Sequence, residues 1–158
     1  MFIREDIPSK LLLVEKNPVE GFYVEINLHK NKWLISCSYN PKRSLISNHL
    51  EALSKNIDIY ASKYDRLILL GDFNAGIEET SLKLFCDLYN LTSMINKPTC
   101  YKNSENPSCI DLILTNSPRF FQNSCTIETG LSDFHKMMVS HEDNLPQNGS
   151  KNYNLQRL

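Results

Sequence analysis

Apolar and polar residues alternate in two neighbouring runs near the start of the chain. From Phe22 to Leu28 every second residue is apolar, and the residues between, Tyr23 among them, would face water. This period of two is typical of a half-buried strand. A polar turn at 29–32 precedes a second run, Trp33–Tyr39, which ends at an Asn-Pro dipeptide. The pattern predicts an antiparallel hairpin with Tyr39 at a strand end beside a loop.

Helical spacing replaces this alternation after residue 44. Apolar residues recur every three or four positions from Ile46 to Tyr60, and Ser44 is placed to cap the first turn. We therefore expect an amphipathic helix here. The run 67–70 is wholly apolar, as in a strand with both faces covered, and it ends at Gly71.

The second half of the chain continues this mixture of helices and strands. A helix is predicted to begin near Thr80, followed by a long polar loop at 96–108 and strands at 110–114 and 136–139. The helix residues expected to be buried are Leu84, Phe85 and Leu88. Together with the hairpin, this order predicts an α/β (α+β) fold with a mixed sheet. The polar stretch 142–158 is expected to form a disordered tail.

Composition and charge limit the functions of this fold. The chain has 158 residues, with 17 Lys and Arg against 18 Asp and Glu. This balance argues against tight nonspecific DNA binding, which needs many cationic phosphate contacts. The cysteines form no C-x-x-C pair, so neither a zinc site nor a redox motif is expected. The charged N-terminus and the lack of a long apolar run predict an intracellular protein, nuclear or cytoplasmic, that is neither secreted nor membrane-bound.

The string Gly71-Asp72-Phe73-Asn74 lies where the buried strand is expected to end. Loop side chains at the carboxyl ends of strands can reach a ligand while the sheet holds them in place. The Asp72 carboxylate can take a proton from water, and the Asn74 amide can donate to an anionic oxygen. Alternatively, the two residues form an Asx-turn that satisfies only local backbone groups. The string alone leaves both interpretations open.

Further acidic residues mark two other strand ends. Asp111 interrupts an apolar run, and a carboxylate buried there needs a cation, a metal ion or several donors; at a strand edge it would face water instead. Asp133 and His135 share one face of an extended segment, although single loop residues of these types are usually solvated. Acidic residues thus stand at three strand ends in succession along the chain, which favours a common site. The histidines without ligand spacing, expected at the surface, are His29, His49 and His141.

The order of four motifs resembles the endonuclease/exonuclease/phosphatase superfamily. The motifs are Tyr39-Asn-Pro, GDFNA at 71–75, IDLILTN at 110–116 and GLSDFH at 130–135. The segments FIREDIPSKLL, IDLILTNSP and ETGLSDFHKMMV are similar in sequence to the endonuclease domain of jockey-like non-LTR (LINE) retrotransposons. The resemblance implies that residues 1–141 form a partial two-sheet sandwich with flanking helices, ahead of the tail at 142–158.

The resemblance also implies a role for each matching residue. Asp72 would activate the attacking water, and Asn74 would bind the scissile phosphate and help to orient that water. Asp111 would orient His135, which contacts a nonbridging phosphate oxygen. Tyr39 would contact the phosphate or steady the leaving oxygen.

A metal site with one ligand missing is implied as well. Asp133 would bind Mg²⁺, with Mn²⁺ as the alternative, and the ion would offset charge that builds on the phosphate. In the family an early Asn and a metal-binding Glu lie on strands that would precede Phe2. This chain is therefore expected to lack them and to hold the ion weakly. In addition, Phe134 separates Asp133 from His135, whereas the family commonly has these two residues adjacent.

Three functions are compatible with these motifs. The first is Mg²⁺-dependent hydrolysis of DNA, which leaves a nick whose 3′-hydroxyl primes the reverse transcriptase domain of an intact element. The second is a catalytically dead retrotransposon remnant, as an incomplete metal site would produce. The third is a small-molecule phosphatase of the same superfamily, which shares the core motifs. The first function predicts nicking of DNA, and the second predicts no activity. The third predicts turnover of soluble phosphate esters without nicking of DNA.

Overall fold

A six-stranded mixed sheet forms the centre of the molecule. The computed structural model describes residues 1–12, 19–28, 30–127, 137–142 and 155–157. The sheet has the order β2-β3-β4-β5-β7-β6, in which β4 and β5 run parallel and the other described neighbours run antiparallel. Its strands are β2 (Ser9–Leu12), β3 (Glu20–Leu28), β4 (Asn31–Tyr39), β5 (Arg66–Asp72), β6 (Thr92–Ser93) and β7 (Asp111–Thr115). The predicted mixed sheet is therefore confirmed.

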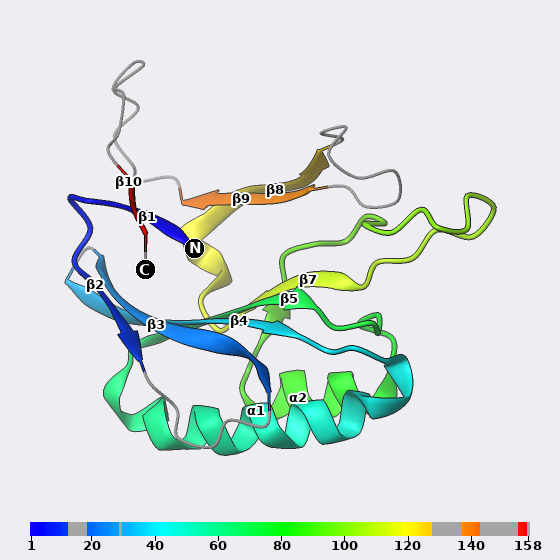
Figure 1. Cartoon of the computed structure of the whole chain (residues 1–158), viewed down its shortest axis with the longest axis horizontal. Coiled ribbons are helices and arrows are strands. Elements are labelled where there is room, and N and C mark those ends of the chain that lie inside the picture. Colours follow the sequence, from blue (N-terminus) through cyan, green and yellow to red (C-terminus); the bar gives the residue numbers. More distant parts are fainter. Residues whose placement is uncertain (13–18, 29, 128–136, 143–154, 158) are drawn as a thin grey trace.

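Helices cover one face of this sheet, and paired strands lie over the other (Figure 1). The helices are α1 (Ile46–Tyr60) and α2 (Thr80–Leu88), with short 3₁₀ helices at Arg43–Leu45, Ala61–Lys63 and Pro118–Phe120. The paired strands are β8 (Phe121–Ile127) with β9 (Met137–Glu142), and β1 (Phe2–Arg4) with β10 (Leu155–Arg157). Each helix in the described part of the chain is too short or too polar to cross a bilayer. The result is an α/β architecture in layers.

The β3–β4 hairpin is confirmed, but its burial differs from the prediction. The two strands pair along their whole length, and Lys30 in the turn adopts a left-handed φ of 64°. Tyr23, expected to face water, is only 1% exposed, because it packs beneath α1 and accepts a hydrogen bond from Asn56 Nδ2 at 3.1 Å. Val24, on the opposite face, is fully buried as well. Both faces of β3 are covered at this point, although the alternating pattern predicted only one.

Helix α1 has the boundaries and the apolar face that its spacing predicted. This face packs on the sheet and consists of Ile46, Leu50, Leu53 and Ile57. Ser44 does not act as the expected cap, because it lies inside the 3₁₀ turn Arg43–Leu45 that precedes the helix. The chain thus enters α1 from a tighter helical turn rather than from an extended residue.

Helix α2 begins at Thr80 as predicted, but it buries a different face. Leu84 is 65% exposed and Leu88 is 71% exposed, so their predicted burial is wrong. The buried residues are Leu82, Phe85 and Cys86, which share one face at three- and four-residue spacing. Helix α2 thus has two apolar faces, and the position of the sheet decides which of them is buried.

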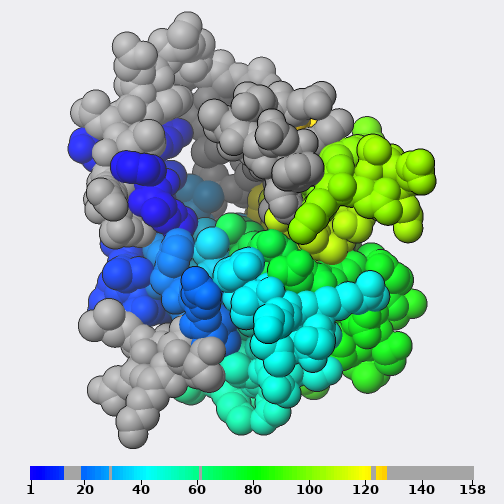
Figure 2. Space-filling view, turned by 45° about the vertical axis from the view of Figure 1, so that its right-hand side comes forward, coloured from blue at the N-terminus to red at the C-terminus, as the bar shows by residue number. Residues whose placement is uncertain are grey.

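The loop between β6 and β7 and the end of the chain complete the fold. The predicted loop at 96–108 is confirmed: it contains the isolated bridge between Cys100 and Ser108, and residues 102–106 are exposed. It stands out from the body of the molecule (Figures 1 and 2) and leads into β7. Within 142–158, the range of the expected tail, Glu142 belongs to β9 and Leu155–Arg157 pair with β1. Residues 143–154 and 158 lie outside the described part.

Candidate active site

One row of side chains crosses four strands at the same level of the sheet. The β3–β4 register pairs Glu20 with Tyr39. The next two registers pair Tyr39 with Asp72 and Asp72 with Asp111. Residues directly opposite each other point to the same face, with Cβ atoms about 5 Å apart in antiparallel pairs. Three of the residues expected in one site therefore lie side by side, and Glu20 extends the row.

This row faces away from the helices. Leu112 and Leu114 alternate with Asp111 along β7 and belong to the core beneath α1. On β5 the core residues are Leu67 and Leu69, five and three positions before Asp72. Because successive side chains of a strand point to opposite faces, both carboxylates lie on the face over which β8 and β9 run (Figure 1). Both aspartates are half-buried, so that the row borders solvent.

The loop after β5 is the Asx-turn that was the alternative interpretation of this string. The Asn74 N–H donates to Asp72 Oδ1 at 2.9 Å, and Asn74 adopts a left-handed φ of 49°. The turn does not rule out chemistry, because a carboxylate has more acceptor sites than one backbone amide fills. The Asx-turn is therefore present, and the catalytic role of the two residues stays a prediction.

Asn40, the residue after Tyr39, binds this loop from the end of β4 through three hydrogen bonds, which we call the clasp. Its backbone N–H donates to Asp72 O at 2.8 Å, and its Nδ2 donates to Phe73 O at 2.8 Å. Its own carbonyl oxygen accepts a hydrogen bond from Asn74 Nδ2 at 2.7 Å. Asn40 lies inside the Tyr39-Asn-Pro motif, but only Tyr39 was assigned a role there, because Asn before Pro is an ordinary turn signal.

Gly71 allows the ends of β4 and β5 to approach closely enough for this clasp. It has a φ of 146°, and a Cβ atom at this position would lie 1.8 Å from Ser38 O. No side chain fits such a distance, and the backbone conformation itself favours glycine. The glycine of the GDFNA string thus has a packing role that brings Asp72 beside Tyr39.

Thr99 fixes the start of β7 next to Asp111. Its Oγ1 accepts hydrogen bonds from the Asp111 N–H at 3.1 Å and from the Ile110 N–H at 3.3 Å. Thr99 itself is fully buried. A residue of the long loop therefore holds the backbone that carries one of the two carboxylates.

Thr99→Val should lower the free energy of unfolding by about 1 to 3 kcal/mol, because it leaves two backbone donors without their acceptor at nearly constant volume. Equilibrium urea unfolding measures this change. Thr92→Val on β6 is the matched control, since Thr92 is exposed, and it should change stability by less than about 0.5 kcal/mol. Identical unfolding midpoints for the two variants would refute the role given to Thr99.

Cys109 precedes Asp111 by two residues but is unsuited to act as a nucleophile at neutral pH. Burial raises the pKa of its thiol, and the negative charges of Asp111 and Glu78 raise the pKa further. The reactive form of cysteine is the thiolate, which these effects disfavour. The polar groups of the row remain the candidates for chemistry.

His49 is buried, and the prediction that it lies at the surface is wrong. It is 8% exposed, its Nε2 lies 3.3 Å from Ser38 Oγ, and its ring meets Phe73 edge-on. Burial lowers the pKa of its imidazole, which is therefore neutral at pH 7. His29 lies outside the described residues, and the side chain of His141 is not described.

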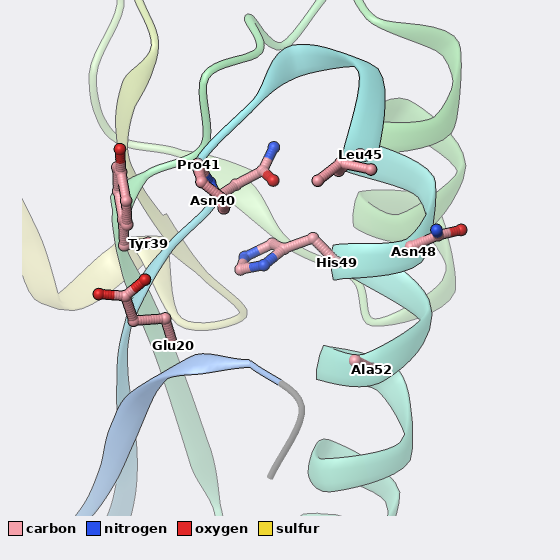
Figure 3. A pocket seen from close by; sticks show the side chains of 8 residues that line it. All are labelled: Glu20, Tyr39, Asn40, Pro41, Leu45, Asn48, His49 and Ala52. Atoms are coloured by element: carbon pink, nitrogen blue, oxygen red, sulfur yellow. The ribbon is translucent and has the colours of Figure 1, made fainter.

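A cavity of about 290 Å³ lies between the end of β4 and α1, beside the row (Figure 3). Figure 3 shows His49 reaching into this space from α1, while the side chains of Tyr39 and Glu20 lie toward the other side of the strands. None of the described residues that line the cavity is Lys or Arg. Glu20 and Tyr39 belong to both the cavity and the row. We place the candidate site at the row, because it also holds the carboxylates of Asp72 and Asp111.

The row of Glu20, Tyr39, Asp72 and Asp111 offers oxygen ligands but not a complete metal site. Carboxylates such as those of Asp72 and Asp111 are the hard donors that Mg²⁺ prefers. Among the residues that the structure describes, no three Asp, Glu, His or Cys side chains gather closely enough to hold a metal ion. Asp133 and His135, the other two expected site residues, lie outside the described residues.

Solved structures with a similar arrangement include nucleases. The endonuclease domain of TRAS1, a telomere-specific non-LTR retrotransposon, has a TM-score of 0.70 and 17% identity, and the match covers 88% of this chain and 70% of that domain. A 3′ phosphatase from Neisseria bound to a product DNA hairpin has a TM-score of 0.60 and 15% identity, with 89% and 72% covered.

An endonuclease/exonuclease/phosphatase family protein from Bacteroides thetaiotaomicron is also similar, with a TM-score of 0.53, 12% identity, and 89% of this chain and 62% of that one covered. No family model matches the sequence, and neither does any curated protein. At these identities the likeness is one of fold. The chain thus has the endonuclease/exonuclease/phosphatase fold that its four motifs predicted.

Proposed function

We propose that this chain is a phosphodiester hydrolase that acts on DNA with the help of a divalent cation. The observation that carries the proposal is the register that sets Asp72 opposite Asp111, with Tyr39 beside them, on one face of the sheet. A general base and polar donors fixed at strand ends are what hydrolysis of a phosphate ester requires. DNA is the favoured substrate because the fold occurs in a retrotransposon endonuclease and in a phosphatase bound to DNA.

Three described residues have distinct parts in this reaction. Asp72 accepts the proton of the attacking water, and the hydrogen bond from the Asn74 N–H holds its carboxylate in one orientation. The Asn74 amide gives one hydrogen to Asn40 O and has a second for a nonbridging phosphate oxygen. Tyr39 is 42% exposed, and its hydroxyl steadies the phosphate or the leaving oxygen.

The remaining parts involve residues outside the described ranges. We assign Asp111 to the orientation of His135, which donates to a nonbridging oxygen. Asp133 is assigned as a ligand of Mg²⁺, or of Mn²⁺, with the carboxylates of the row as neighbouring oxygen donors. When bound, the ion offsets the charge that builds on the phosphate during attack.

Nicking of supercoiled plasmid by the purified full chain tests this proposal. With millimolar Mg²⁺ we expect conversion to the nicked form, loss of that conversion in a chelator, and ends that a DNA polymerase extends from a 3′-hydroxyl. Mg²⁺ should also raise the melting temperature, because an ion that binds the folded state stabilises it.

Other outcomes of the same experiment would assign another function. Turnover of soluble phosphate esters without nicking of DNA would indicate a small-molecule phosphatase. If neither substrate is hydrolysed and neither Mg²⁺ nor Mn²⁺ moves the melting temperature, the chain is a catalytically dead remnant and the proposal is wrong.

A further inference from the structure

The clasp between Asn40 and the loop at 72–74 joins the end of β4 to the proposed general base. We infer that Asn40 is a positioning residue, which fixes Asp72 and Asn74 through backbone groups without touching the substrate. Its effect on rate rests on the proposed function, whereas its effect on the loop does not. The inference gives a role to the Asn of the Tyr39-Asn-Pro motif, in which only Tyr39 was assigned one.

The hydrogen bonds of the clasp reach each residue of the loop in turn. The Asn40 N–H donates to Asp72 O, the Asn40 Nδ2 donates to Phe73 O, and the Asn40 carbonyl accepts from Asn74 Nδ2. Phe73 is fully buried between the two residues that carry the chemistry. A left-handed residue such as Asn74 persists where the surroundings determine its conformation, and the clasp supplies such surroundings.

The chemistry of the partners sets the direction of both side-chain amides. Backbone carbonyl oxygens only accept hydrogen bonds, so the nitrogen of the Asn40 amide must face Phe73 O. By the same argument, the nitrogen of the Asn74 amide must face Asn40 O. This arrangement fixes where the second hydrogen of the Asn74 amide points, and the Asn74 N–H in turn fixes Asp72 Oδ1.

Burial and hydrogen bonding separate a positioning role from a catalytic one. Asn40 is fully buried, although it is among the residues around the cavity beside the row, and each of its hydrogen bonds described above goes to the loop at 72–74. We therefore assign it to positioning. Its Oδ1 is buried without a hydrogen-bond partner among the described residues, which costs free energy that a leucine of similar size would avoid. An asparagine at this position is explained by its donor to Phe73 O, since the acceptor of the same side chain is unused.

A second contact joins the segment after β4 to the segment after β5, and it is weaker than the clasp. Arg43 and Glu79 form an ion pair at 3.0 Å, but the Arg43 side chain is 68% exposed. Ion pairs at such positions contribute little, because water and salt screen them. The buried clasp of Asn40 is therefore the contact expected to control the geometry of the loop.

Asn40→Leu tests the inference, with Asn56→Leu as the matched control. Asn56 is also a buried asparagine, and its Nδ2 donates a hydrogen bond to the Tyr23 hydroxyl on the helix side of the sheet. Asn40→Leu should lower kcat for hydrolysis at least about tenfold, with KM changed less than about twofold, because a small misplacement of reacting groups is costly. Asn56→Leu should leave both constants near those of the wild-type chain.

Amide hydrogen exchange tests the clasp even without activity. The Asn74 N–H should exchange at least about tenfold faster in Asn40→Leu, while the Leu114 N–H in the core should not. If Asn40→Leu does not fold, Asn40→Ala carries the same expectations. If the wild-type chain hydrolyses no substrate, only the proposed function is wrong, and the amide exchange rates still test the role of Asn40. Wild-type exchange at Asn74 in the Asn40 variant, or equal effects of Asn56→Leu, would overturn it.

Discussion

Gly71→Ala should lower the free energy of unfolding by about 3 kcal/mol or more, which is a large fraction of the stability of a small domain. The added Cβ would lie 1.8 Å from Ser38 O, a backbone atom that cannot rotate away. The substitution must therefore separate β4 from β5, and a φ of 146° adds backbone strain. Equilibrium denaturation followed by circular dichroism measures the change.

Gly76→Ala is the matched control for this experiment. A Cβ at Gly76 would meet the carboxylate oxygens of Glu78 at 2.3 Å, but these belong to the end of a flexible side chain that can turn away. This variant should unfold within about 1 kcal/mol of the wild-type chain. If Gly71→Ala were as stable as Gly76→Ala, the close approach of the two strand ends would be disproved.

Asp72→Asn should reduce hydrolysis by about 10²- to 10⁴-fold, because it removes the group that takes the proton from water while keeping the shape of the loop. Asp111→Asn should also reduce hydrolysis, since it lies opposite Asp72 in the register. Initial rates of plasmid nicking at saturating Mg²⁺ measure both. The melting temperatures should change little, since each aspartate borders solvent.

Asp87→Asn is the control for these two variants. Asp87 is an exposed aspartate on α2, on the helix side of the molecule, and its loss should leave the rate unchanged. Wild-type rates for Asp72→Asn would show that another group activates the water. A uniform loss in all three variants would point to a change in overall charge or folding rather than to the row.

Local patterns predicted the regular elements well and their burial less well. The hairpin, α1, the strand predicted at 67–70 and the start of α2 follow from spacing within single segments. Tyr23 and Leu84 were assigned to the wrong environment, because burial depends on which element packs over a face. The short strands β1, β2, β6 and β10 were not predicted, since their runs are too short to show a period. The longer strand β8 and its pairing with β9 were not predicted either.

The candidate site was predictable in part, for a related reason. Tyr39, Asp72 and Asp111 stand next to recognisable strand ends, and the register brings them into one row. Asn40 and Thr99 act through buried hydrogen bonds to backbone groups far along the chain. Polar residues of this kind look like ordinary loop residues until the partners are known. Asp133 and His135 stay predictions.

The parallel pairing of β4 with β5 has a consequence for the order in which the molecule assembles. Asn40 and Phe73 are 33 residues apart, and α1 must cross between their strands before they meet. The entropy of closing this long segment has to be overcome before any contact in the row forms. Catalytic competence is therefore expected to arrive late in folding, and fragments that hold only one of the two strands should possess none of it.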